Sequence, residues 1–297
     1  MGGFKYKKNG QWMDLQIPSS INLDSFTPED VDDIKKQLFN IRKKMLCNCT
    51  PAVQVKAVED GLYNAVQGGA TDGSFLYFYR MSGDDSKWMI VKYDPATDSI
   101  IASRTGDTSS VEHHWHGNDI TYNSKTGYLY LVEQWSESGT SISKINPETL
   151  EQVERISLER GIYALAYDAA NNRYVGCSST LNQLYILDGE LSLVRIVGGP
   201  VSEYVAQGAE CDENYIYILK SRTANSNRNF TLVYDWYGNY IGEWELPCND
   251  AFYEVEFMAK INDNTIYYGA CNKNYNGYTL YKSRIKNLNY LYEITSN

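Results

Sequence analysis

The sequence predicts an all-β protein, because one pattern of turns and strands recurs five times between about residue 60 and the C-terminus. Each repeat has a small or apolar stretch, a turn, a Tyr-rich strand and a second hairpin. The first turns occupy 71–73, 123–127, 168–172, 212–214 and 262–264, and the Tyr-rich strands after them occupy 75–79, 128–132, 173–176, 215–219 and 265–269. A period in the forties with four short strands per repeat is typical of a propeller blade. The predicted fold is therefore a five-bladed β-propeller over residues 51–297, preceded by a short N-terminal hairpin and a heptad helix.

Residues 1–25 form the predicted attachment segment, in which Asn9-Gly10 is the expected turn of a short hairpin. Residues 26–50 predict a short coiled-coil-like helix that begins with Thr27 as its N-cap. Its apolar residues alternate in spacings of three and four, as in a heptad seam, and they are Val31, Ile34, Leu38, Ile41 and Met45. A helix of two heptads is marginal by itself. It is therefore expected either to pack on its own domain or to join copies of the chain as a homotrimer.

The last repeat predicts how the ring closes. It contains four candidate strands of its own, ending at residues 291–294, so that closure by a shared strand is not required. The alternating residues 53–58 could nevertheless add an outer edge strand. The innermost strands of the five blades are expected at 66–72, 117–123, 162–168, 206–212 and 255–262.

Composition narrows the classes of function. The chain has 297 residues with a formal net charge of −10, which argues against a nucleic-acid partner and suits either simple solubility or a neutral or cationic ligand. Its 26 tyrosines, against 8 phenylalanines, suit both strands and binding surfaces. No signal peptide and no apolar run of membrane-spanning length are visible. The 6 cysteines are expected to be reduced apolar fillers.

Four polar residues are expected at one depth of the central channel: Gln67, Asn118, Tyr163 and Gln207. Amide and hydroxyl groups there would bind water or the hydroxyls of a sugar through paired donors and acceptors. The alternative is that they satisfy backbone groups at a crowded axis.

The segment 113–119 contains all 3 histidines of the chain. His114 and His116 are expected on one face of a strand with Asn118, while Trp115 and Asp119 take the other face or the turn. A metal site would need further protein ligands, and no other histidine exists to supply them, so neither a metal nor a cofactor is expected. General acid/base chemistry by His116 with Asp119, ligand binding, and a local structural role all remain open.

Four acids lie near the expected inner strands: Asp119, Glu210, Glu254 and Glu256. They do not recur at matched positions in the repeats, and no nucleophile elbow, P-loop or dinucleotide motif is present. The chain is therefore expected not to be an enzyme. The alternative is a carbohydrate-active hydrolase or lyase that uses Asp119, Glu210 and His116.

The layout of attachment segment, short helix and propeller resembles the tail-tip receptor-binding proteins and upper baseplate fibres of siphophages that infect Gram-positive bacteria. The residues that carry the resemblance are Gln67-Gly68-Gly69, His116-Gly117-Asn118-Asp119 and Gln207-Gly208-Ala209, together with the opening KYKKNGQWMDL. The resemblance implies a virion protein, made in the host cytoplasm, that trimerises through its helix, contacts other tail or baseplate proteins and binds a cell-wall glycan. The stem is far shorter than in the staphylococcal pattern, and no distal domains follow the propeller, which leaves a platform role open. A third reading is an intracellular propeller scaffold for protein partners.

Overall fold

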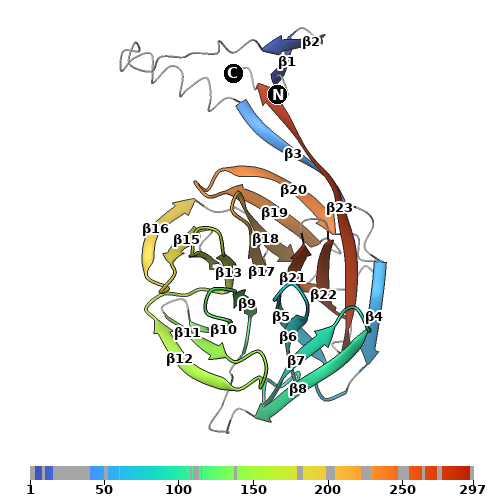
Figure 1. Ribbon diagram of the computed structural model, residues 1–297, viewed down its shortest axis with the longest axis vertical. Coiled ribbons are helices and arrows are strands. Elements are labelled where there is room, and N and C mark those ends of the chain that lie inside the picture. The colour runs from blue at the N-terminus through green and yellow to red at the C-terminus, as the bar shows by residue number, and fades with distance from the viewer. Residues whose placement is uncertain are drawn as a thin grey trace.

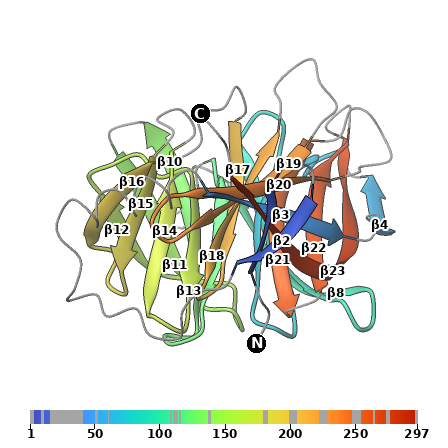
Figure 2. The same ribbon diagram turned by 90° about the horizontal axis from the view of Figure 1, so that it is seen from above.

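The computed structural model describes residues 4–8, 11–15, 41–49, 53–59, 61–107, 109, 114, 116–136, 139–178, 183–198, 205–221, 229–246, 254–262, 265–272 and 276–294. All regular structure within these ranges is β-strand, and the main body is a ring of five sheets around a central axis (Figure 1). The view at right angles shows the ring edge-on, with the strands running through its thickness (Figure 2). The predicted all-β, five-bladed propeller is confirmed.

The first four blades each consist of four consecutive antiparallel strands, ordered from the axis outward. Blade 1 contains β5 (Ala65–Thr71), β6 (Leu76–Met81), β7 (Lys87–Asp94) and β8 (Ser99–Asp107). Blade 2 contains β9 (Asp119–Asn123), β10 (Tyr128–Ser136), β11 (Gly139–Ile145) and β12 (Gln152–Leu158). Blade 3 contains β13 (Ala164–Asp168), β14 (Arg173–Cys177), β15 (Gln183–Asp188) and β16 (Leu193–Gly198). Blade 4 contains β17 (Val205–Cys211), β18 (Tyr215–Ser221), β19 (Asn229–Asp235) and β20 (Tyr240–Leu246).

Blade 5 closes the ring with a strand from the other end of the propeller sequence. Its strands β21 (Glu254–Asn262), β22 (Thr265–Cys271) and β23 (Gly277–Ile294) are completed by β4 (Val53–Glu59), which pairs antiparallel with the first part of β23. The outer edge strand considered for residues 53–58 is therefore confirmed, and the expectation that blade 5 supplies all four of its own strands is wrong. The physical reason is that residues 281–294 contain no glycine or proline that would favour a reversal of the chain, so β23 continues as one strand.

The second part of β23 pairs with β3 (Ile41–Cys49), from Ile285 opposite Cys49 to Ile294 opposite Ile41. The helix expected over residues 26–50 is thus wrong over 41–49, because Ile41 and Met45 belong to a strand whose partner lies some 240 residues later in sequence. The other seam residues, Val31, Ile34 and Leu38, lie outside the described residues. In Figure 1, β3 and the end of β23 extend away from the ring.

The predicted N-terminal hairpin is confirmed as β1 (Phe4–Lys8) paired with β2 (Gln11–Leu15). Lys8 stands opposite Gln11 and Phe4 opposite Leu15. No helix within the described residues is long and apolar enough to cross a membrane.

The turn after each inner strand explains much of the repeated sequence. Asp72 Oδ1 accepts the backbone N–H groups of Ser74 and Phe75, while its Oδ2 accepts the Tyr77 hydroxyl at 2.8 Å. Asp212 does the same in blade 4, where the hydroxyl donor is Tyr217, also at 2.8 Å. An acid that caps its own turn and binds the tyrosine five residues later fixes the hairpin geometry. Part of the tyrosine enrichment is therefore structural.

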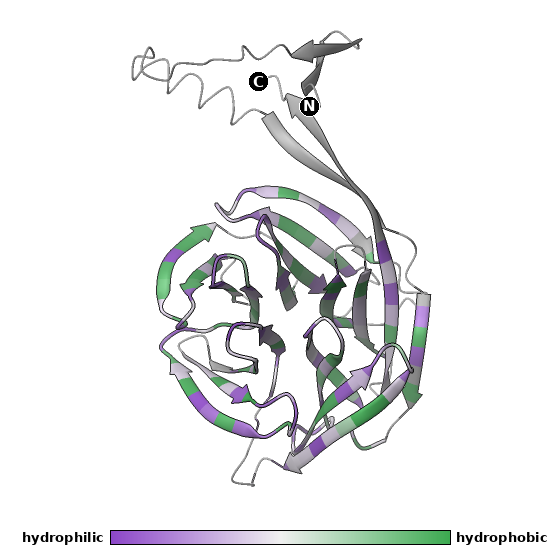
Figure 3. Cartoon of the chain, viewed as in Figure 1, coloured by the Kyte–Doolittle hydropathy of each residue, from purple (hydrophilic) through white to green (hydrophobic). Residues whose placement is uncertain are grey.

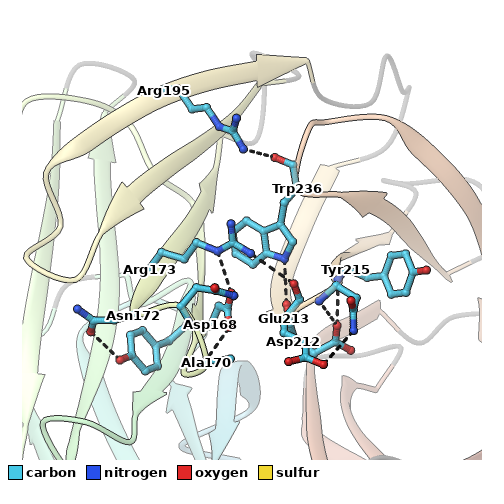
Figure 4. Close-up of polar contacts among 12 residues, drawn as sticks. Asp168, Ala170, Asn172, Arg173, Arg195, Asp212, Glu213, Tyr215 and Trp236 are labelled. Carbon is cyan, nitrogen blue, oxygen red and sulfur yellow. Dashed lines mark hydrogen bonds and ion pairs between the residues drawn. The ribbon is translucent and has the colours of Figure 1, made fainter. Parts of the chain in front are cut away.

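The core lies between neighbouring blades. Phe78 of blade 1 stacks on Phe257 of blade 5 with ring centroids 6.0 Å apart. Between blades 3 and 4, the Arg173 guanidinium lies 3.5 Å from the centre of the Trp236 ring, and the Trp236 indole N–H donates to the Asp212 carbonyl at 2.9 Å (Figure 4). By contrast, outer strands such as β8 and β12 mix hydrophobic and hydrophilic residues along their length (Figure 3). The seams therefore carry the packing, and the outer strands face solvent.

Candidate functional site

Asp119 occupies the axis of the ring and joins three blades. Its Oδ1 accepts the backbone N–H of Ile120 at 2.9 Å, and its Oδ2 accepts those of Leu165 and Ala209, each at 3.0 Å. The side chain is only 1% exposed, and burial raises its pKa well above the usual value although the three N–H donors oppose the rise. A side chain at Gly68 would place its Cβ 2.0 Å from the Asp119 Cα, so the Gln67-Gly68-Gly69 motif needs a glycine there. Asp119 thus serves as an internal anchor.

The two described histidines lie in different surroundings, before β9 begins, and do not share the face of a strand as expected. His114 is buried, with its Nδ1 2.9 Å from Glu133 Oε1 and its ring packed edge-on against Trp88. His116 is partly exposed, and its Nδ1 lies 3.3 Å from Asp85 Oδ2. His116 and Asp119, considered together as one alternative for acid/base chemistry, do not form a pair: Asp119 binds backbone N–H groups, and His116 lies beside Asp85. Trp115 lies outside the described residues.

Glu133 holds His114 in a buried polar network between β10 and β11. It also accepts the Ser143 hydroxyl at 2.5 Å and forms an ion pair with Arg155. Burial opposes ionisation of Glu133, but His114, Ser143 and Arg155 together lower its pKa below the usual value. Because His114 and Glu133 are both fully buried and only Arg155 reaches toward solvent, the geometry assigns His114 a structural role.

The four polar residues expected at one depth are only partly brought together. Gln67 and Gln207 each lie in an irregularity of an inner strand, where the register of β5 and of β17 shifts. Gln207 donates its amide N–H to Glu254, and burial together with Glu256 and Glu254 raises the pKa of Tyr163. β-Bulges commonly redirect side chains near functional sites. Tyr163 and Gln207 therefore cluster with two glutamates at the end of the channel where the inner strands begin.

Asn118, the fourth of these residues, is buried. Neither the Oδ1 nor the Nδ2 atom of its side-chain amide has a hydrogen-bond partner among the residues described. Glu256 lies in a third irregularity, in β21, and burial beside Glu254 raises its pKa well above the usual value.

The opposite end of the channel opens into a cavity of about 180 Å³, which we call the channel mouth. All five blades contribute to its wall. Its lining residues are Gly69, Ala70, Thr71, Asp72, Ile120, Thr121, Tyr122, Ser124, Tyr167, Ala169, Ala209, Glu210 and Lys260. Of these, the sequence singles out Glu210 as a candidate acid, and Gly69 and Ala209 only as members of the two Gln-Gly motifs. A signal was available, because Thr71, Tyr122 and Tyr167 each directly precede the capping acid or asparagine of the first turn in their blade.

The charges at the channel mouth are mainly acidic. Glu210 accepts the backbone N–H groups of Cys211 at 2.9 Å and Lys260 at 3.1 Å, and burial raises its pKa to about 7. Lys260 is the only basic residue in the described lining, and its Nζ lies 2.9 Å from Asp212 Oδ2. Burial opposes ionisation of Asp212, but Lys260 holds its pKa below the usual value. The single lysine is therefore already paired.

No group of three or more histidine, cysteine, aspartate or glutamate side chains suited to hold a metal ion occurs among the described residues. Within the same part of the chain, Cys177, Cys211 and Cys271 are buried and free of disulfide bonds.

No protein-family model matches this sequence, and no curated protein matches it. Among solved structures, it is similar to the tail fiber of Staphylococcus aureus phage P68, at 12% identity and a TM-score of 0.46, over 87% of this chain and 56% of that one. It is also similar to the WD40 repeats of RRP9, at 10% identity and a TM-score of 0.45, over 79% and 84% of the two chains. Kuenenia stuttgartiensis hydrazine synthase matches at 13% identity and a TM-score of 0.43, over 73% of this chain and 58% of that one. The matched region thus spans somewhat over half of the phage fiber and of the synthase, and what the chain shares with these proteins is the propeller fold.

Proposed function

We propose that this protein is a component of a virion tail fibre or baseplate, and that its propeller binds one sugar unit of a cell-surface glycan in the channel mouth. The observation that carries the binding part of the proposal is the cavity itself, to which every blade contributes wall residues. A concave polar site at one end of a rigid ring positions its groups without a folding cost on binding.

The chemistry of the wall suits a sugar. Thr71, Thr121 and Ser124 provide hydroxyl groups that both donate and accept hydrogen bonds. Tyr122 and Tyr167 provide aromatic rings, whose apolar faces suit the C–H face of a pyranose. Tyr122 is partly exposed, whereas the Tyr167 hydroxyl is engaged by Asn172 at 2.9 Å. Tyr122 is therefore the ring available to a ligand.

The size of the cavity limits the ligand. Sites for drug-sized molecules usually enclose roughly 300–1,000 Å³, and the channel mouth holds about 180 Å³. It accommodates one terminal sugar unit rather than a long oligosaccharide. Affinity for a single unit is expected to be weak, so a multivalent arrangement would be needed for firm attachment.

The proposal includes association of three chains through residues 1–50, with other tail or baseplate proteins bound at the same end. This region contains the two-stranded hairpin β1–β2 and the strand β3, and the end of β23 extends beyond the ring beside β3 (Figure 1). With Ile41 and Met45 in a strand, the remaining apolar seam of Val31, Ile34 and Leu38 spans about one heptad, which is too short to associate by itself.

A hydrolase remains the second candidate, because Glu210 lies in the cavity with a pKa near neutrality, as a general acid requires. Against it, both carboxylate oxygens of Glu210 already accept backbone N–H groups. We propose binding without turnover.

The test is a titration of the full-length protein with a panel of monosaccharides, followed by calorimetry or ligand-observed NMR. Tyr122→Ala is expected to weaken binding by at least about tenfold, since stacking and wall contact are both lost. The matched control is Tyr240→Ala, which removes an exposed ring on the outer strand of blade 4 and is expected to leave affinity unchanged. Binding that survives Tyr122→Ala would place the ligand elsewhere, and release of product from a glycan that stops in Glu210→Gln would favour the hydrolase.

A further inference from the structure

Carboxyl groups from four turns and strands converge on the channel mouth. Asp72 and Glu210 belong to its wall, on blades 1 and 4, which are not neighbours in the ring. Asp119 lies directly beneath, because it binds the backbone N–H of Ala209, which is itself a wall residue. Asp212 stands beside the wall and is tied to Lys260. A ligand in the mouth therefore meets the carboxyl groups of Asp72 and Glu210, with Asp119 and Asp212 behind the wall.

The one lysine of the wall offers little to an anionic ligand. Lys260 is held by Asp212 and lies over the ring of Tyr217, 6.0 Å from its centre. An anion that engaged Lys260 would have to displace Asp212, and it would still face Asp72 and Glu210. Like charges that meet in a partly buried site cost several-fold in affinity or more.

We propose, building on the glycan site above, that the channel mouth selects a sugar that carries a protonated amine over its neutral N-acyl counterpart and over an acidic sugar, with Glu210 as the residue that confers this preference. Asp72 Oδ1 already accepts two backbone N–H groups of its turn, and its Oδ2 accepts the Tyr77 hydroxyl. Each oxygen of the Glu210 carboxyl group accepts only one backbone N–H, so both keep capacity for a further hydrogen bond. Glu210 is the wall carboxyl best placed to face an ammonium group.

Because Glu210 titrates near neutrality, the affinity for an amino sugar is expected to depend on pH. Burial raises the pKa of Glu210 to about 7, and a bound ammonium would favour the ionised form. The other titratable groups of the wall are Asp72, Lys260, Tyr122 and Tyr167, and Asp119 and Asp212 lie behind it. Burial raises the pKa of both Asp119 and Tyr167, while Lys260 keeps Asp212 ionised despite its burial. Binding of the amine below pH 7 is therefore expected to release a proton from Glu210.

The experiment is calorimetric titration of the intact protein with glucosamine, N-acetylglucosamine and glucuronic acid at pH 5.5 and pH 7.0. We expect glucosamine to bind about tenfold more tightly than N-acetylglucosamine at pH 7.0, as for a hydrogen bond between charged groups. The affinity for glucosamine should fall roughly tenfold at pH 5.5, because the ionised fraction of a group with a pKa near 7 falls from about half to a few per cent. Glucuronic acid should bind least.

Glu210→Gln should bring glucosamine and N-acetylglucosamine to within about twofold of each other and remove the pH dependence. Glu190→Gln, in the exposed second turn of blade 3, is the charge-matched control and should change nothing. Because the Gln side chain could disturb the N–H groups of Cys211 and Lys260, the wild-type titration is repeated in buffers of different ionisation enthalpy, where proton release appears without any substitution.

Equal or tighter binding of N-acetylglucosamine by the wild type, or the absence of proton release with glucosamine, would overturn the amine preference and leave the glycan site standing. If none of the three sugars binds, the glycan site and the preference both fail.

Discussion

At the scale of single residues, Asp119 shows that an acid which the sequence suggests as a catalytic or ligand-binding residue can have a structural role instead. An acid at the start of an inner strand is visible in the sequence, and so is its neighbour His116. The backbone partners of Asp119, by contrast, come from blades 3 and 4, at Leu165 and Ala209. Such long-range pairing leaves no local pattern, and for that reason the sequence predicts a ligand-binding or catalytic role for this acid.

Replacement of Asp119 tests the anchor. Asp119→Ala leaves three buried N–H groups without an acceptor, each at a cost of about 1–3 kcal/mol, and we expect urea unfolding to show a loss of about 3–5 kcal/mol. The comparison is Asp94→Ala, which removes an exposed turn cap that binds Ala96 and Thr97 and should cost about 1 kcal/mol or less. Similar losses in the two variants would mean that the axial hydrogen bonds contribute little.

At the scale of elements, sequence patterns that span a few residues predict most of the strands and hairpins. They do not predict which distant strands pair with one another. The inner strands and both hairpins of each blade follow from turns such as Asp72 and Asp212, whose capping bonds involve the next few residues. The strands β3 and β4 find their partner in β23, more than two hundred residues away, and local sequence carries no record of that partner. The heptad spacing of 31–45 likewise fits an extended strand over its last part, because an apolar residue suits either conformation.

Two truncations separate the roles of these elements. Removal of residues 1–50 is expected to reduce the mass in solution from three times the 33.9 kDa chain mass to that of one chain, as measured by light scattering, with the propeller still folded. Removal of residues 1–60 also deletes β4, which leaves the edge of β23 unpaired in blade 5 and breaks the link between Lys56 and Asp98. The second truncation should lower the unfolding midpoint by 10 °C or more, roughly the effect of a few kcal/mol in a domain of this size.

A monomeric full-length chain would contradict the trimer. Equal unfolding midpoints for the two truncated proteins would show that β4 is dispensable for ring closure.

At the scale of the whole molecule, the five blades share one fold, but different polar and acidic side chains gather at the two ends of the channel. Where the inner strands begin, Gln207, Tyr163 and two glutamates gather; where they end, the channel mouth opens. Repeat alignment predicted the first group in part. The residues that line the channel mouth could be found in the same alignment, because several of them directly precede the first turn of a blade. Whether Thr71, Tyr122 and Tyr167 enclose a cavity depends on how closely the five blades approach one another, which the alignment does not show.

The acids near the axis predict how stability depends on pH. Burial raises the pKa of Glu210 to about 7 and raises those of Asp119 and Glu256 well above their usual values. A carboxyl with a raised pKa binds its proton more tightly in the folded state, so its contribution to stability is present below its unfolded pKa and is lost as pH rises through the folded value. Stability should therefore decline between about pH 5 and pH 7.5, with Glu210 responsible for on the order of 1–3 kcal/mol of the decline.

Thermal unfolding across this pH range measures the effect. Glu210→Gln is expected to flatten the decline, and Glu190→Gln, an exposed acid on a turn, should retain the wild-type profile. Acids such as Asp212 and Glu133, whose pKa values are lowered, act in the opposite direction, since their stabilisation is lost only as pH falls through their folded pKa values. Together the two sets place the maximum of stability on the acidic side of neutrality, and a maximum above pH 7.5 in the wild type would show that the axial carboxyl groups are not protonated in the folded ring.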